Sequence, residues 1–283
     1  MNKILPFHIH SDASVFDGVS KIEEYAKKIS SNPDKYLQAM MISEHGTLSS
    51  QLEAYKTCKK YDLRYIPANE IYFQETFDEN AKFYHLLLFG VNEESYREMI
   101  KINNLACKEG RFIKRKTINT LSDLKLLEHT FCSTACIGGY TNVELDEKRL
   151  LQLYNIFNDK LIIELQTFND GKQLEANLFN QRMMHKHNLN CILASDAHCV
   201  EEKDTPLINV ARAMGFKMPL KVLHKQWGKE NHNTYLKCYD DFARENEDYQ
   251  LGIKEENFNK SLQFGLSVFY MTEDFELFRK QEF

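Results

Sequence analysis

The sequence has little of what marks membrane, secreted or general nucleic-acid-binding proteins. No apolar run approaches the ~18 residues that a membrane span requires, and the N-terminal stretch lacks the long apolar core of a secretory signal. The 7 cysteines include no C-x-x-C pair, which argues against a disulfide framework and favours a reducing compartment. The net charge is −5, so any contact with nucleic acid should be local. We therefore expect a cytoplasmic protein with no membrane partner.

A glycine-rich phosphate loop is also missing after the first expected strand, which disfavours an open doubly wound sheet. Short apolar runs alternate with helical patterns, as in a parallel α/β sheet or barrel covered by helices. Strands are expected at residues 4–9, 39–43, 63–67, 86–91, 130–139, 160–166 and 191–195. Polar residues recur where these strands give way to loops, which is where α/β barrels carry their active sites.

The stretch from Phe7 to Gly18 is the first of these polar strand ends. In an extended strand alternate side chains share a face, so His8 and His10 should point the same way, with Ile9 in the packing behind them. Asp17 follows in a turn-rich segment. Imidazole and carboxylate groups together are ligands for zinc, manganese or iron. Alone, a His-x-His pair is weak support for a metal site.

Further histidine, acidic and cysteine residues occur at the ends of other expected strands. Taken singly, a histidine at a strand end is usually a satisfied polar residue, and a single cysteine is usually a small core residue. Together, so many ionisable groups at one barrel mouth would need a partner of opposite charge, which divalent cations supply. The candidate metal ligands are His8, His10, Asp17, His45, Glu70, His85, Cys136, Asp196 and His198.

One dense basic cluster, K-E-G-R-F-I-K-R-K, covers residues 108–116. A solvated loop and a phosphate-docking element both remain open for this segment. If it docks phosphate, the candidate substrate-binding residues are Arg111, Lys114 and Arg115.

Seven motifs occur in order between about Leu5 and Val200. They are H-I-H-S-D-A-S-V-F-D-G, I-S-E-H-G, A-N-E-I-Y, Y-H-L-L-L, T-A-C-I-G-G, I-I-E-L-Q and S-D-A-H. In these motifs the chain resembles the polymerase and histidinol phosphatase (PHP) family. It is most similar to the PHP domain at the N-terminus of the bacterial DNA polymerase III alpha subunit. Two positions depart from the family pattern: Glu44 stands where aspartate is usual, and Ser195 where asparagine is common.

The resemblance implies an α/β fold, a distorted TIM-like barrel of seven strands and seven helices at residues 1–204. A small, mainly helical C-terminal extension would cover residues 205–283 and pack on the barrel. It also implies two or three divalent ions (zinc, manganese or iron). One ion would be held by His8, His10, Glu70 and Asp196; Glu70 would bridge to a second ion, held by His85 and Cys136; and a third would be held by Asp17, His45 and His198. Asp17, His45, Glu70 and Asp196 are the residues expected to act in catalysis.

The implied activity is metal-dependent hydrolysis of phosphodiester bonds at a trinuclear centre, expected to be a 3′-5′ DNA exonuclease activity. A DNA 3′ end or another phosphate ester would be the substrate, and a replication polymerase is a possible partner. The chain stops at Phe283, where the family's polymerases continue, so we do not expect it to polymerise DNA. Two alternatives remain open: a phosphatase of nucleotide or histidinol-phosphate type, and a non-catalytic, polymerase-associated interaction module.

Overall fold

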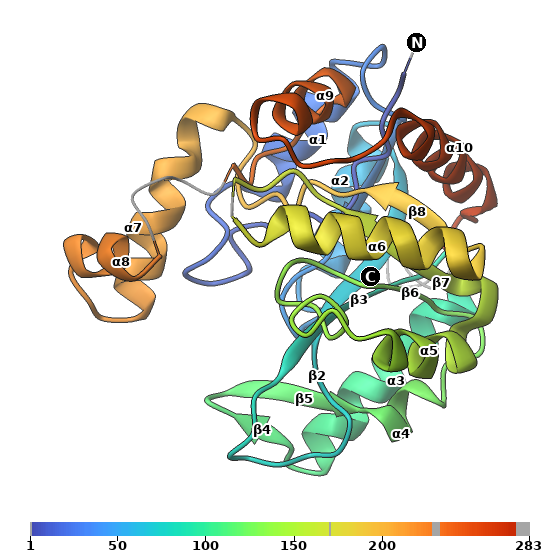
Figure 1. The fold of residues 1–283 in the computed structure, drawn as a ribbon, viewed down its shortest axis with the longest axis vertical. Helices are drawn as coiled ribbons and strands as arrows, with labels where there is room; N and C mark the ends of the chain where they lie inside the picture. The colour runs from blue at the N-terminus through green and yellow to red at the C-terminus, as the bar shows by residue number, and fades with distance from the viewer. Residues whose placement is uncertain (1, 170, 228–232, 276–283) are drawn as a thin grey trace.

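The computed structural model describes residues 2–169, 171–227 and 233–275, and it has a mixed α/β fold around one sheet (Figure 1). Neighbouring strands follow the path β4-β5-β2-β3-β6-β7-β8, and β1 pairs with the first half of β2. The strands are β1 (Ala39–Ile42), β2 (Arg64–Gln74), β3 (Tyr84–Phe89), β4 (Phe112–Ile113), β5 (Lys116–Thr120), β6 (Phe131–Ser133), β7 (Leu161–Leu165) and β8 (Asn190–Leu193).

Helices follow most of the strands and supply the outer layer of the fold. They are α1 (Ile22–Ser30), α2 (Gln51–Lys60), α3 (Glu93–Lys108), α4 (Leu121–Leu124), α5 (Glu147–Phe157), α6 (Gln173–His187), α7 (Thr205–Gly215), α8 (Leu220–Trp227), α9 (Tyr239–Asp248) and α10 (Glu255–Met271). Short 3₁₀ turns lie at Asn158–Lys160 and Glu202–Asp204. Within the described ranges, no helix is long and apolar enough to cross a membrane.

The segment Ile4–His10 lies between β1 and β8, although it is not a regular strand as the sequence predicted. Ile9 accepts a hydrogen bond from Ser43 N, just after β1, and His8 accepts one from Ala197 N, just after β8. The departure from a strand comes at His8, whose φ is 62°. This left-handed backbone interrupts the alternation of faces, so that His8 turns toward the side that His10 also faces. The sheet with this segment corresponds to the expected distorted barrel.

Strand β3 runs antiparallel to both neighbours, β2 and β6, whereas the sequence pattern predicted a parallel sheet. The reason lies in the connection between β2 and β3, which is a short loop without a helix. Such a loop can join only antiparallel strands, because a parallel return needs a crossover of a dozen or more residues. As a consequence, the beginning of β3 lies beside the second half of β2, where His85 is paired with Tyr72.

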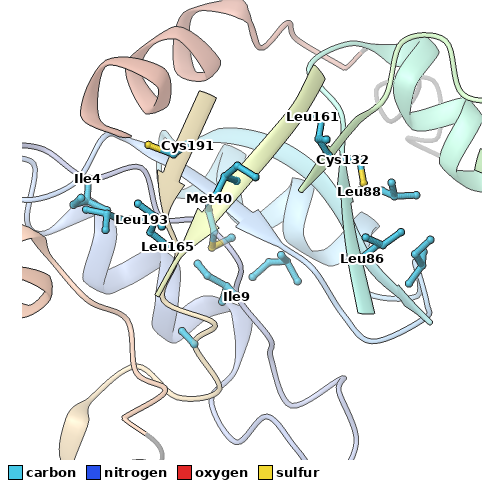
Figure 2. Close-up of a cluster of buried hydrophobic side chains, with 14 of the residues drawn as sticks. Ile4, Ile9, Met40, Leu86, Leu88, Cys132, Leu161, Leu165, Cys191 and Leu193 are labelled. Atoms are coloured by element: carbon cyan, nitrogen blue, oxygen red, sulfur yellow. The ribbon is translucent and has the colours of Figure 1, made fainter. Parts of the chain in front are cut away.

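The strands separate two apolar clusters. The larger one combines residues of the strands with residues of the covering helices, and Figure 2 shows part of it. In the smaller, inner cluster α10 is the only helix represented among the described residues. Along β2 the inner face carries Ile66, Ala68 and then Glu70, and along β7 it carries Ile162 and then Glu164. Because side chains two apart share a face, the apolar interior leads directly to acidic side chains at one end of the barrel.

In the C-terminal part of the chain, one helix packs on the sheet and two others project from the molecule. Helix α10 contributes Phe264 and Val268 to the inner cluster, and Ser261 Oγ accepts a hydrogen bond from Leu193 N at 2.7 Å. A Cβ on Gly265 would come within 3.1 Å of Leu5 Cβ, so glycine allows close approach there. Helices α7 and α8 project to one side of the molecule (Figure 1). The division at residue 204 remains a prediction, and α10 shares the barrel's core.

Candidate metal centre

Glu70 is the residue around which the candidate site is arranged. It lies within β2, is fully buried, and is surrounded by four histidines from three segments of the chain. Its Oε2 is 2.7 Å from His45 Nδ1 and 3.3 Å from His10 Nε2. Its Oε1 is 3.1 Å from His85 Nδ1 and 3.3 Å from His8 Nε2. The two oxygens of one carboxylate therefore face different pairs of imidazoles.

Asp196 lies opposite Glu70, just beyond β8. Its Oδ1 is 3.2 Å from His8 Nε2 and 3.3 Å from His10 Nε2, so both histidines lie between the two carboxylates. The predicted common face of His8 and His10 is thus observed, although the strand is not regular. Asp196 has a φ of 43°, a left-handed conformation that aspartate and asparagine adopt more readily than most residues. The carbonyl of Asp196 accepts a hydrogen bond from His198 Nδ1 at 2.8 Å.

The other predicted residues join the same cluster. Asp17 Oδ2 is 3.0 Å from His45 Nε2 and 3.4 Å from His198 Nε2. Cys136 Sγ is 3.5 Å from His85 Nδ1 and 3.7 Å from Glu70 Oε1. All nine candidate ligands therefore lie in one contact network, and their roles as ligands remain predictions. His85 reaches it from the start of a strand, because β3 is antiparallel.

The electrostatics of the cluster favour a cation. Burial alone would raise the pKa of the Glu70 carboxyl, but His85, His8 and His45 outweigh burial and hold that pKa well below its usual range. Burial lowers the pKa of His45, but Glu70 and Asp17 together raise it to about 10. Burial raises the pKa of the Cys136 thiol, and Glu70 adds to this effect. The buried carboxylates therefore attract positive charge, and a metal would displace protons from its histidine and cysteine ligands.

The unpaired atoms of the cluster test whether a metal fits these residues. Buried polar atoms normally have a hydrogen-bond partner, and each exception needs an explanation. Here several buried nitrogens and oxygens lie near one another without hydrogen-bond geometry. They are His8 Nε2, His10 Nε2, His45 Nδ1, Glu70 Oε2, Asp196 Oδ1 and His198 Nε2. Imidazole nitrogens and carboxylate oxygens that converge in this way suit zinc, manganese or iron.

Glu164 is a functional candidate that the sequence interpretation did not assign. Its Oε2 is 2.8 Å from His8 Nδ1, on the far side of the ring from Glu70. Ser133 and Gln166 donate hydrogen bonds to the same carboxylate. A carboxylate of this kind fixes the orientation and tautomer of a ligand histidine. The sequence did contain a signal for this role. Glu164 is an acidic residue within the apolar run Leu161–Leu165, and a buried carboxylate requires partners.

We expect Glu164→Gln to weaken metal binding by about 10- to 100-fold, the usual effect of losing such a second contact to a ligand histidine. The amide keeps the size of the side chain but removes the charge next to His8. Metal affinity measured by competition with a chelator checks this. Glu98→Gln is the matched control, because Glu98 accepts hydrogen bonds from Thr130 and His129 away from the cluster. Equal affinities in the two variants would contradict the role of Glu164.

Arg212 is the second residue that sequence reasoning missed, and it comes from α7 in the C-terminal extension. Its Nε lies 2.5 Å from Asp17 Oδ1. Although burial alone would raise the pKa of Asp17, His198 and Arg212 hold it well below its usual range. No sequence signal connects Arg212 with Asp17, because they meet only through tertiary folding. The extension therefore contributes a side chain to the edge of the cluster.

The three predicted substrate-binding residues lie on or beside the β4–β5 hairpin. Arg111 is buried, with Nη1 2.9 Å from Asp123 Oδ2 and a hydrogen bond to Thr120, so its guanidinium anchors the hairpin to α4. This placement does not support phosphate docking by Arg111. Lys114 and Arg115 form the exposed turn of the hairpin, and docking by these two residues remains a prediction.

Comparison with solved structures finds partial similarity. One is a crystal structure of a candidate metal-dependent phosphoesterase from Bifidobacterium adolescentis, at 15% identity and a TM-score of 0.47, covering 70% of this chain and 88% of that one. Another is an amidohydrolase from Chromobacterium violaceum with bound sulfate and no metal, at 12% identity and a TM-score of 0.46, covering 70% and 88%.

Comparison with curated proteins finds DNA polymerase III alpha subunits. The Aquifex aeolicus subunit is 28% identical over 237 residues, which is 77% of this chain and 20% of that protein. The Borreliella burgdorferi subunit is 27% identical over 231 residues, which is 76% of this chain and 20% of that protein. The chain thus spans about a fifth of the length of these relatives. The family model described as "PHP domain" matches residues 6–168, more than half of the chain. The chain therefore belongs to the PHP domain family.

Proposed function

We propose that this protein is a metal-dependent phosphoesterase that hydrolyses phosphodiester bonds at the 3′ end of DNA. The observation that carries the proposal is the convergence of unpaired histidine and carboxylate atoms on one point at the barrel's end. When bound there, divalent ions would polarise the phosphoryl group and lower the pKa of a water molecule. Similarity to polymerase alpha subunits supports a DNA substrate over a small phosphate ester.

The arrangement of the cluster supports a centre with more than one metal. Glu70 faces two histidines with each of its oxygens, as a bridging carboxylate would. Three groups each bring one donor atom per residue within 4.8 Å of the others: His8, His10 and Asp196; His45, Glu70 and His85; and His10, His45 and His198. The first group lies within the first expected ligand set. The other two groups mix the expected sets, so the distribution of ions among the ligands is part of the proposal.

The protein's own residues would bind and orient the substrate beside the ions. His8 and His10 lie between Glu70 and Asp196, and Glu164 contacts the other ring nitrogen of His8, so these contacts would orient the two imidazoles before substrate binds. Asp17 and His45 are partly exposed and form the open side of the cluster, where a phosphate could enter. Cys136 brings a soft ligand, which favours zinc or iron over magnesium.

We expect the purified protein to carry two or three transition-metal ions and to hydrolyse a chromogenic phosphodiester. Chelation should reduce the rate to background, and adding manganese or zinc should restore it, because the ligand set depends on a cation. Elemental analysis and the hydrolysis rate, measured on the same sample, check both statements. Less than one metal per chain after growth with added manganese and zinc would refute the proposed centre.

A second role, as an interaction module, is favoured by the surface of the projecting helices. Leu207, Val210 and Met214 on α7 are 53%, 43% and 64% exposed. Exposed apolar side chains that cluster on one helix often mark a protein interface. Whether a replication polymerase is the partner can be tested by co-purification, with Met214→Lys as the variant expected to lose the partner.

A further inference from the structure

The β4–β5 hairpin extends from the edge of the metal cluster. Strand β5 runs parallel to the second half of β2, with Ile118 paired with Tyr72. Figure 1 shows the hairpin projecting beside the loop between β2 and β3. The hairpin carries the basic cluster of the sequence, so its position decides whether those charges can reach a substrate at the metal centre.

Lys116, the first residue of β5, is connected to the cluster through Tyr72. Its Nζ lies 4.2 Å from the centre of the Tyr72 ring and 5.0 Å from that of Phe83. The Tyr72 ring is in turn 5.9 Å from the ring of His45 and 5.3 Å from that of His85. Lys116 is therefore one aromatic ring away from two of the candidate metal ligands.

The charge of Lys116 is held near the site without an acidic partner of its own. In the part of the chain that the structure describes, no carboxylate lies within ion-pair distance of its ammonium. Burial lowers the pKa of Lys116, while Asp17 and Glu70 oppose that effect. A half-buried ammonium over aromatic rings, beside a phosphoesterase centre, is suited to bind an additional phosphate.

The outer end of the hairpin repeats this combination of charge and aromatic surface. Lys114 and Arg115 have left-handed backbones, with φ of 48° and 70°, and form the two-residue turn. Both side chains are exposed, and neither forms an ion pair within the described ranges. Phe112 on β4 is 45% exposed. Proteins that bind single strands combine cations along the backbone with aromatic rings on which bases stack.

We propose that the β4–β5 hairpin is a binding element for single-stranded DNA. Lys116 takes the phosphate next to the one at the metal cluster, and Lys114, Arg115 and Phe112 hold the strand farther out. This inference rests on the proposed function and deepens it, because it names a polynucleotide strand as the substrate class. A small phosphate ester would not extend to the turn of the hairpin.

Binding can be measured separately from hydrolysis. The probe is a fluorescent DNA strand of about a dozen nucleotides with phosphorothioate linkages, and anisotropy gives its affinity in manganese buffer. The first variant combines Lys114→Asn with Arg115→Gly, which removes both charges and suits a turn with left-handed residues. The second is Lys116→Met, which keeps an unbranched side chain, shorter by one atom, and removes the charge. Lys101→Gln, on the exposed face of α3, is the matched control.

The turn variant should bind the strand at least about tenfold more weakly than wild type at low salt. Its plot of log affinity against log salt should be less steep by about 1.4, since each phosphate contact contributes about 0.7 for a single strand. Lys116→Met should flatten the slope by about 0.7. The Lys101→Gln control should bind within about twofold of wild type. Because no bond is cleaved, these results do not depend on the hydrolysis rate.

Hydrolysis then separates this inference from the proposed function. For both hairpin variants, kcat/KM should fall about tenfold more for the DNA strand than for a chromogenic phosphodiester, which has only one phosphate. If the wild-type protein hydrolysed neither substrate, the proposed phosphoesterase activity would be refuted. The binding data would still show whether the β4–β5 hairpin binds single-stranded DNA. The inference is overturned if both hairpin variants bind like the control. It is also overturned if duplex DNA binds to wild type as tightly as the single strand.

Discussion

Replacing Glu70 with glutamine is expected to reduce phosphodiester hydrolysis by at least ~100-fold and to lower the metal content, while the fold is retained. Loss of a group that only hydrogen-bonds to a metal ligand already reduces metal affinity or activity by about 10- to 100-fold. Glu70 does more than support, because its two oxygens face His8 and His85 on one side and His10 and His45 on the other. The amide removes the charge that the proposed metals share, and it changes the shape of the side chain little.

Three measurements on Glu70→Gln decide the assignment: metal stoichiometry, thermal unfolding and hydrolysis rate. Glu245→Gln is the matched control, since Glu245 is a buried carboxylate paired with Lys237 and is not part of the candidate ligand set. That control should lose stability, because an unpaired buried charge remains, but it should keep its metals. If Glu70→Gln retained both the metals and the rate of wild type, Glu70 would not be a bridging ligand.

The variant Asp196→Asn is expected to abolish hydrolysis with little change in the fold of the metal-free protein. Burial alone would raise the pKa of Asp196, but His8 and His198 outweigh burial and keep the carboxyl ionised. Asparagine removes this charge and tolerates the left-handed backbone at position 196, where φ is 43°, better than alanine would. The substitution therefore isolates the loss of a carboxylate from backbone strain.

Metal-dependent stabilisation gives a second readout for Asp196→Asn. A ligand that binds only the folded state raises the unfolding temperature, and the rise grows with the logarithm of its affinity. Wild type should therefore unfold at a higher temperature with manganese or zinc than with a chelator, and the difference should shrink in the variant. Hydrolysis within a few-fold of wild type would show that Asp196 is not a ligand.

That the candidate ligands gather at one end of the sheet could be expected from the sequence, because their signals are local. Each candidate ligand stands near an expected strand, in a short motif, and the structure brings all of them together. The fold class was also predictable, since the alternation of apolar runs and helical patterns reports on a sheet covered by helices. Glu44 illustrates how a departure from the family pattern is accommodated: its carboxylate accepts hydrogen bonds from Ser11 and Ser14, beside His10.

Features that depend on tertiary folding could not be predicted from local patterns. The antiparallel direction of β3 follows from a short loop, which the apolar pattern does not encode. The left-handed backbone of His8 occurs where the segment accepts hydrogen bonds on two sides, from Ser43 N at Ile9 and from Ala197 N at His8 itself. Arg212 meets Asp17 only because α7 returns to the barrel's mouth. The sequence interpretation also ended β2 near residue 67, because it took the polar Glu70 as a strand end, whereas β2 continues to Gln74.

The position of Ile4–His10 between β1 and β8 affects the order in which the ligand cluster can form while the protein is being synthesised on the ribosome. His8 and His10 are synthesised long before their partner Asp196, which is made only when the barrel is nearly complete. Until then the N-terminal segment lacks its neighbour Ala197 and one edge of the sheet stays unpaired. Glu70 and His85, by contrast, belong to one hairpin and can meet early, since local contacts form fastest. The nascent chain therefore acquires the full ligand set only after His198 has emerged.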